Sequence, residues 1–391
     1  MMRRLAAVLA LALAAACSGG DSAPVDRLVV VDREGRVVTV EPDGSNPTVL
    51  SEEGTSAFQP VWSPDATRIA WGSTSSSSFA LAVADVASGE VSLTEVEANP
   101  FYLSWAPVGD RLGLLRNDGS GLAFETATVE EDGVTISTLD TGSSYYFDWR
   151  PDGERVASHV GRDRFDFIDL DGEIDEVGVA PGIYQAPQWI DRGILTISGG
   201  DDGTASEIVL ADEGGDTEVI ARTDGLVSFV ADPAGERLAV FSLLPGGPDA
   251  VSAALVQEML EPNTLSVVDL ADGTVTEVTS EPVAVFMWSP DGEKLLVMGM
   301  GSAPGRVRWS VWSEEDGLVA GPDFAPSPHW VEDYMPFHDQ YTRSMTLWSP
   351  DSGSFAFPGE RDDREGIWRY DVESGESTFV TEGAWVVWSP V

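Results

Sequence analysis

Short apolar runs separated by turn residues extend along almost the whole chain, and one phrase recurs among them. A tryptophan is followed by S-P-D-G or a variant and then by an apolar run, as in "MWSPDGEKLLVMG" from Met287. Proline presets φ, aspartate can bond the turn backbone and glycine accepts a positive φ, so each phrase predicts a turn between two strands. The tryptophans that mark the repeat are Trp62, Trp105, Trp149, Trp189, Trp288, Trp348 and Trp388.

The repeat has the period of a four-stranded unit. Successive marker positions, with Val230 in place of one tryptophan, are 40 to 44 residues apart, except for two spacings of 58 and 60 residues. Each unit also contains further strand-like runs, such as "FALAVADV" and "EVSLTEV" in the first. A period of about 40–45 residues with this pattern is typical of β-propeller blades. The count of first strands predicts an all-β propeller of about eight blades, or seven if the weak unit at Val230 is not a blade.

The two ends of the chain are incomplete units that complement each other. Residues 384–388, "AWVVW", supply one first strand, whereas the stretch after residue 26 supplies three strand-like runs without a first strand. Pairing the two ends completes a blade and closes the ring, which removes exposed sheet edges. We therefore expect one propeller domain over residues 27–391.

The repeated phrase resembles the WD40-like repeats of TolB-type propellers, in which W-S-P-D-G followed by a strand recurs once per blade. The resemblance covers about residues 27–391 and implies the fold. It implies little about function, because such propellers serve as scaffolds, binding modules and appendages of peptidases. The chain shows no counterpart of the domain that precedes the propeller in TolB itself, so a role in the Tol–Pal envelope system is not implied.

The repeat tryptophans have two possible roles. The first is structural, because a large indole can act as a wedge between neighbouring blades. The alternative is stacking against a ligand. We expect the structural role.

Charge excludes one class of partner. The chain has 66 acidic and 22 basic residues, so its surface repels phosphate backbones and nucleic-acid binding is excluded. The acids are spread along the chain, as on a solvated surface. We expect a monomer without a cofactor.

The N-terminal stretch is typical of an export signal. A basic start is followed by an apolar run of about a dozen residues, which ends in "LAAAC" and so resembles a bacterial lipobox ending in the only cysteine, Cys17. We expect a signal peptide over residues 1–16, lipidation of Cys17, and a flexible tether over 17–26. The protein would then be anchored to the outer side of the cytoplasmic membrane. The alternative is an ordinary secretory signal with an incidental cysteine.

Two insertions account for the longer spacings. They lie around 245–262 and 325–343, in links that both fall on the face opposite the S-P-D-G turns, so we expect them to cap that end of the channel. The first reads as a helix that lays Met259 on the rim. The second is rich in aromatic residues, which with methionine are typical anchors of binding surfaces. The candidate partner-binding residues are Trp330, Tyr334, Met335, Phe337, His338 and Met259. The alternative is that these residues only pin the loop to the ring.

Sites for chemistry are weakly indicated. The stretch "HWVEDYMPFHD" from His329 contains imidazoles and carboxylates, but their spacing matches no established set of metal ligands. "DLDGEID" at 169–175 lacks the length of a calcium loop. No G-x-S-x-G nucleophile motif is present. We therefore expect no metal site, no catalytic residues and a non-catalytic protein that binds a protein or peptide, where a basic segment would suit the acidic surface. The alternative is an envelope enzyme or small-ligand binder that acts on a glycan or peptide at the channel mouth.

Overall fold

A computed structural model describes residues 26–130, 133–161, 164–179, 182, 185–199, 205–224, 226–243 and 263–391. The predicted signal peptide, Cys17, most of the tether, and the first insertion with Met259 lie outside the described residues.

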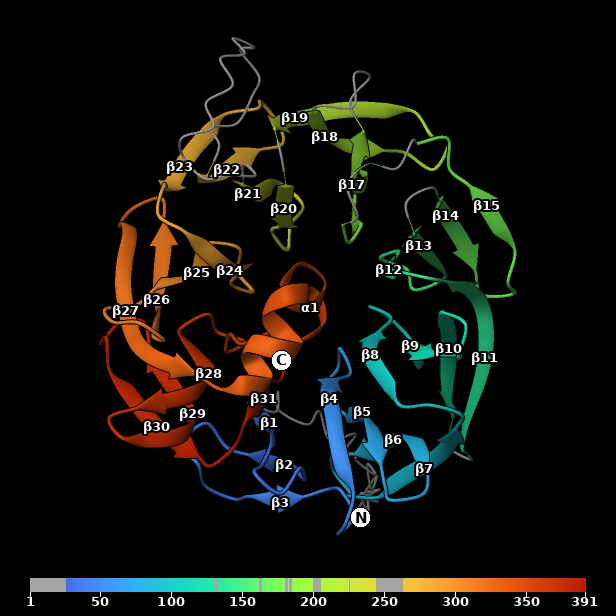
Figure 1. The fold of residues 1–391 in the computed structure, drawn as a ribbon, viewed down its shortest axis with the longest axis vertical. Coiled ribbons are helices and arrows are strands. Elements are labelled where there is room, and N and C mark those ends of the chain that lie inside the picture. The colour runs from blue at the N-terminus through green and yellow to red at the C-terminus, as the bar shows by residue number, and fades with distance from the viewer. Residues whose placement is uncertain are drawn as a thin grey trace, which may run out of the picture.

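The described chain folds into antiparallel sheets that stand around a central axis like the blades of a propeller (Figure 1). In five of the sheets, four strands follow one another along the chain. Their strands are β4 (Ser56–Trp62), β5 (Arg68–Thr74), β6 (Phe79–Asp85) and β7 (Val91–Val96); β8 (Pro100–Trp105), β9 (Arg111–Asn117), β10 (Leu122–Glu130) and β11 (Gly133–Gly142); β12 (Tyr145–Trp149), β13 (Arg155–Val160), β14 (Arg164–Asp169) and β15 (Ile174–Glu176); β16 (Gln188–Ile190), β17 (Gly193–Gly199), β18 (Ala205–Ala211) and β19 (Thr217–Asp224); and β20 (Leu226–Ala231), β21 (Arg237–Leu243), β22 (Leu265–Asp269) and β23 (Val275–Thr279).

A sixth sheet joins the two ends of the described chain. The C-terminal strand β31 (Trp385–Trp388) pairs with β1 (Leu28–Val31), which continues to β2 (Val37–Val40) and β3 (Thr48–Val49). The register runs from Leu28 opposite Trp388 to Val31 opposite Trp385.

The seventh sheet has seven strands and an irregular middle. It contains β24 (Val283–Trp288), β25 (Lys294–Met300), β26 (Val307–Ser313), β27 (Gly317–Pro326), β28 (Ser354–Arg361), β29 (Arg364–Asp371) and β30 (Ser377–Thr381). Only two residue pairs join β27 to β28. On the inner side of β28, a single bridge from Trp348 to Phe355 stands where the other units have an inner strand.

The repeated phrase forms the turns between first and second strands. The Ser289 hydroxyl donates to Asp291 Oδ1 at 2.5 Å and accepts from the Lys294 N–H at 2.9 Å, which closes the turn. Gly292 has a φ of 72°, and Ser352 holds the same position of another turn at a φ of 56°. We call the side of the ring that carries these turns the turn face and the opposite side the loop face.

Several repeat tryptophans bridge adjacent sheets. The indole Nε1 of Trp105 donates to the Val61 carbonyl at 3.4 Å, and the indole of Trp288 donates to the Val230 carbonyl at 3.0 Å. The acceptor in each case belongs to the inner strand of the preceding sheet. Each indole therefore packs between two sheets and also joins them by a hydrogen bond.

The second insertion is helical and lies in the centre of the ring (Figure 1). It contains a π-helix η1 (Trp330–Tyr334), a 3-10 turn η2 (Met335–Phe337) and helix α1 (His338–Ser344). We call residues 327–346 the helical segment. It contacts the inner strands β8, β20 and β24, so it fills the channel rather than only capping its end as expected. In the described part of the chain, no helix is long and apolar enough to span a membrane.

Candidate binding site

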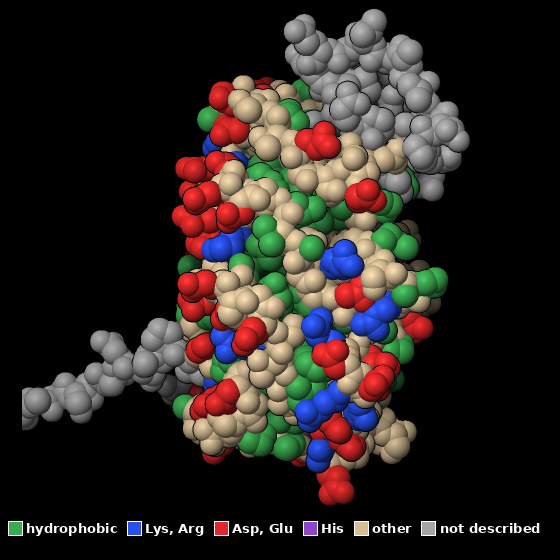
Figure 2. Space-filling model, turned by 90° about the vertical axis from the view of Figure 1, so that its left-hand side faces the viewer, with side chains coloured by type: hydrophobic (Ala, Val, Ile, Leu, Met, Phe, Trp, Pro, Cys, Tyr) green, Lys and Arg blue, Asp and Glu red, His purple; other side chains and the backbone are tan. Residues whose placement is uncertain are grey.

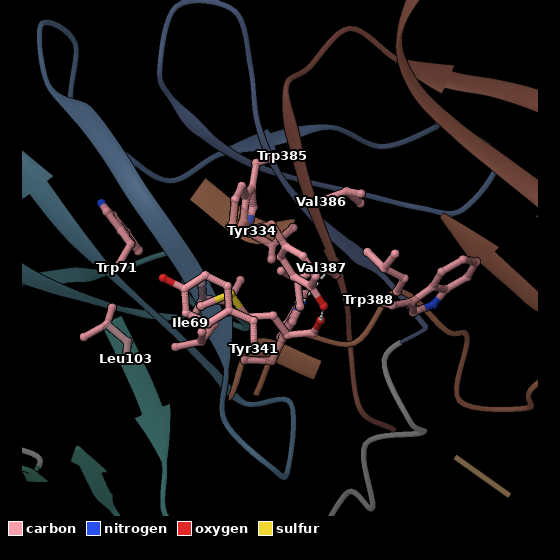
Figure 3. Packing of buried hydrophobic residues seen from close by; sticks show 14 of the residues in the cluster. Ile69, Trp71, Leu103, Tyr334, Tyr341, Trp385, Val386, Val387 and Trp388 are labelled. Atoms are coloured by element: carbon pink, nitrogen blue, oxygen red, sulfur yellow. Dashed lines mark hydrogen bonds between the residues drawn. The ribbon is translucent and has the colours of Figure 1, made fainter. Parts of the chain in front are cut away.

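Two predicted anchors are buried packing residues of the helical segment. Trp330 and Tyr334 stack at 3.9 Å, and each is 1% exposed. Tyr334 also packs edge-on against Trp385 of the C-terminal strand at 5.7 Å (Figure 3). The expectation that these two rings face a partner is therefore corrected. Around the channel the inner strands leave a hollow that large apolar side chains fill, because this removes them from water.

The other predicted residues of this segment lie at its outer surface or part-way into the channel. Phe337 is 42% exposed, and Met335 is partly buried against the core. The His338 ring contacts Phe286 at 5.2 Å, and its Nε2 lies 3.3 Å from the Ser228 hydroxyl. Phe337 is thus the predicted anchor with an exposed ring.

Polar contacts hold α1 across the channel. Asp339 accepts hydrogen bonds from the Gln185 amide and from the Ala186 N–H, and burial raises the pKa of its carboxyl. Arg343 donates to the Trp189 carbonyl at 3.0 Å and lies 3.3 Å from Asp148. Burial raises the pKa of Asp148, an effect that the Arg343 charge opposes. The segment therefore touches inner strands from several sheets.

A first cavity on the loop face is aromatic, and we call it the aromatic pocket. Its volume is about 240 Å³. Phe337, Phe101 and Tyr146 line it, and the stacked rings of Tyr102 and Tyr341 lie 5.4 Å apart in its wall. The full lining is Phe101, Tyr102, Leu115, Leu122, Ser143, Ser144, Tyr145, Tyr146, Phe337, Gln340 and Tyr341. Its shape and chemistry suit an apolar or aromatic side chain.

A second loop-face cavity is lined by carboxylates, and we call it the acidic groove. Its volume is about 540 Å³, and it lies between the β1–β2 turn and the helical segment. The carboxylates in its lining are Asp32, Glu34, Asp333 and Glu365. The cation in the lining is Arg33, which pairs with Glu365 at 3.3 Å. Asp333 accepts from His329 Nδ1 at 3.2 Å.

Gln59 connects the two cavities. It lies in β4 where the register shifts, and its φ of 46° turns the side chain inward, as bulges do. It lines the acidic groove, and its Nε2 donates to the Tyr341 hydroxyl at 2.5 Å in the wall of the aromatic pocket. Gln59 is 3% exposed, and among the described residues its Oε1 has no hydrogen-bond partner.

A third cavity opens on the turn face and has a volume of about 520 Å³. Prolines of the repeated turns and the indoles of Trp149, Trp189 and Trp288 form its walls, and Arg343 lies at its floor. The end of the helical segment thus closes the channel from this side.

Metal-ligand geometry appears at one place in the described chain. The ligand atoms of Asp169, Asp171 and Glu173 lie within 4.8 Å of one another. These residues belong to the stretch 169–175, which is shorter than a calcium loop. One of these carboxylates, Asp169, already forms an ion pair with Arg155, whose Nε lies 2.6 Å away. The described structure does not bring three of the ligands of the 329–339 stretch together in this way.

Several site residues carried no sequence signal. Gln59 precedes a repeat phrase, and nothing in the phrase marks its side chain as inward-facing. Phe101 and Tyr146 look like ordinary strand residues, and only the ring places them beside Phe337. A bulge and a contact between distant segments have no periodicity that could predict them.

Comparison with known proteins supports the fold. No family model matches the chain, and no curated protein matches it. The propeller domain of the Trilobed protease from Pyrococcus furiosus superposes with a TM-score of 0.51 and 14% identity, over 85% of this chain and 97% of that one. A eukaryotic initiation factor superposes with a TM-score of 0.59 and 14% identity, over 93% of this chain and 98% of that one. TolB from Acinetobacter baumannii superposes with a TM-score of 0.39 and 16% identity, over 76% of this chain and 64% of that one.

The chain is an all-β protein with repeated four-stranded sheets, and its fold is that of a β-propeller. The expected resemblance in fold is therefore confirmed.

Proposed function

We propose that this protein is a non-catalytic, extracytoplasmic propeller that binds a protein or peptide partner on its loop face, with the aromatic pocket as the main contact. The ring would have eight blades, closed by the pairing of β1 with β31 and with residues 345–348 taking the place of one inner strand. The segment up to Cys17 supports export and a lipid anchor outside the cytoplasmic membrane.

The distribution of exposed apolar side chains carries this proposal. Among the described residues, exposed apolar side chains lie on the loop face at strand ends and on the helical segment. They are Phe79, Leu226, Met300, Val331 and Phe337. On the turn face the corresponding exposed side chains are all aliphatic, namely Val108, Ile174, Val275, Leu318 and Val391, so in the described chain the exposed aromatic rings and Met300 lie on the loop face. Exposed aromatic and methionine side chains gathered on one face of an acidic protein are typical of an interaction surface. An edge-on view shows acidic side chains crowded along one border of the molecule (Figure 2).

Site-specific crosslinking tests the proposal. A photo-crosslinking amino acid would replace Phe337 in one variant of the full chain and Val108 in a matched variant, because both side chains are exposed and lie on opposite faces. We expect a discrete adduct in intact cells from position 337 alone. Adducts from position 108 only, or from neither position, would contradict binding at the loop face.

The turn-face cavity supports a second candidate function. Its volume of about 520 Å³ lies within the range of small-ligand sites, and Arg343 at its floor offers a cation to an anionic ligand. A thermal-shift screen of small carboxylates against the full chain and Arg343→Met would test it. Stabilisation of the wild type alone would favour this site, and no shift with any carboxylate would count against it.

A further inference from the structure

We propose that the acidic groove is a second subsite, which takes an arginine or lysine side chain of the same peptide whose apolar side chain enters the aromatic pocket. This inference rests on the proposed function and specifies its ligand: a peptide with one large apolar residue and one basic residue close together in sequence.

The charge of the groove favours a cation. Four carboxylates line it, and Arg33, together with Arg36 behind it, offsets part of their charge through pairs with Glu365, Asp32 and Glu34. Among the described residues, the one ionic partner of Asp333 is the His329 imidazole, at 3.2 Å. A negative charge that no guanidinium compensates therefore remains beside the helical segment.

Gln59 supplies an independent requirement for a hydrogen-bond donor. Its Oε1 is a buried acceptor without a partner among the described residues, and leaving such a group unpaired is unfavourable. A guanidinium or ammonium group carries several donors and no acceptor, so it matches an acceptor-lined site. The indole of Trp385 belongs to the same lining.

The two subsites are joined through the helical segment. Gln59 in the groove bonds the Tyr341 hydroxyl in the wall of the aromatic pocket. Asp333 and Phe337 are four residues apart on the segment, which is roughly 6 Å at the rise of a helix. An extended peptide rises about 3.3 Å per residue, so its apolar and basic residues would be at least about two positions apart, and the reach of long side chains extends this to about four.

Selection from a random dodecapeptide library on the immobilised full chain tests this inference. We expect enrichment of an aromatic or large aliphatic residue with Arg or Lys two to four positions away. A selected peptide should bind about tenfold more tightly than its Arg→Gln counterpart, as charge-assisted hydrogen bonds imply. On Asp333→Asn this advantage should disappear, while the preference for the apolar residue remains. Glu332→Gln, an exposed acid on the same segment outside the groove lining, is the matched control and should retain both preferences.

The possible failures are distinguishable. Enrichment of the apolar residue without a basic one, or equal affinity of the two peptides on the wild type, would overturn the groove inference and leave the proposed function standing. Selected peptides whose binding is unaffected by Phe337→Ser, or no enrichment at all, would overturn both. A second variant, Gln59→Leu, removes the unpaired acceptor without changing charge and should lower affinity for the Arg peptide more than for its Gln counterpart.

Discussion

The ring and the helical segment are stabilised in different ways, although residues of both pack in the same hydrophobic cluster. In β24 an antiparallel ladder with β25, broken by one register shift near Val283, fixes the backbone, and the repeat turn sets the register. The segment that precedes Trp348 has no such ladder on the ring, and side-chain contacts such as the Trp330–Tyr334 stack hold it in the channel. A ladder tolerates many side chains, whereas a side-chain network depends on each member. The segment is therefore the part of the molecule where binding properties can change while the ring stays the same.

The largest effect should come from removing the packing centre of the segment. Trp330→Ala deletes a ring that is 1% exposed, and substitutions of this kind cost about 3–5 kcal/mol. We expect a lower free energy of unfolding in urea with an unchanged far-UV β-sheet signal, because the ladders of the ring remain. The exposed Val331→Ala is the control. A Trp330→Ala variant as stable as the wild type would show that the segment contributes nothing to the fold.

The next effect concerns the ion pair between the segment and the ring. Arg343→Met leaves Asp148, whose side chain is 15% exposed, without its cation. We expect a loss of about 2 kcal/mol, less than for a fully buried pair because the Arg343 side chain is 31% exposed. Adding Asp148→Asn should restore most of the loss in the same denaturation assay. No recovery in the double variant would mean that Arg343 acts through packing alone.

A smaller effect compares two repeat tryptophans. The Trp288 indole donates to the Val230 carbonyl at 3.0 Å, whereas among the described residues Trp348 Nε1 is buried without a partner. Both replacements by phenylalanine lose ring volume, but only Trp288→Phe also breaks a hydrogen bond. We expect Trp288→Phe to be about 1 kcal/mol more destabilising than Trp348→Phe. Equal losses would mean that packing between the sheets explains the repeat without this bond.

The smallest effect is a pH dependence. Burial lowers the pKa of His338, so the folded state resists the proton that the unfolded chain takes up below about pH 6.5. Stability should therefore fall as the pH decreases from 7 to 5, and the fall should be shallower in His338→Gln. The buried carboxyl of Asp339 has a raised pKa, which acts in the opposite direction, because that stability is lost as the pH rises. If the free energy of unfolding falls equally with pH in the wild type and in His338→Gln, His338 does not cause the pH dependence.

The sequence was a good guide to the ring for a physical reason. The turn around Ser289, Asp291 and Gly292 is local, and its hydrogen bonds join residues within five positions of each other. Repetition of such a local rule specifies strands and their order. Composition pointed to the aromatic residues of the second insertion but could not predict which of them are exposed. The burial of Trp330 depends on strands far away in sequence.

By itself, the sequence determined the all-β repeat, the turn chemistry and the acidic surface, since these depend on neighbouring residues and on composition. Only the tertiary structure decided that the helical segment fills the channel, that Phe337 stays exposed while Trp330 does not, and that Gln59 reaches Tyr341. These features arise where segments hundreds of residues apart meet, and the shape of the hollow between the inner strands selects which side chains it buries.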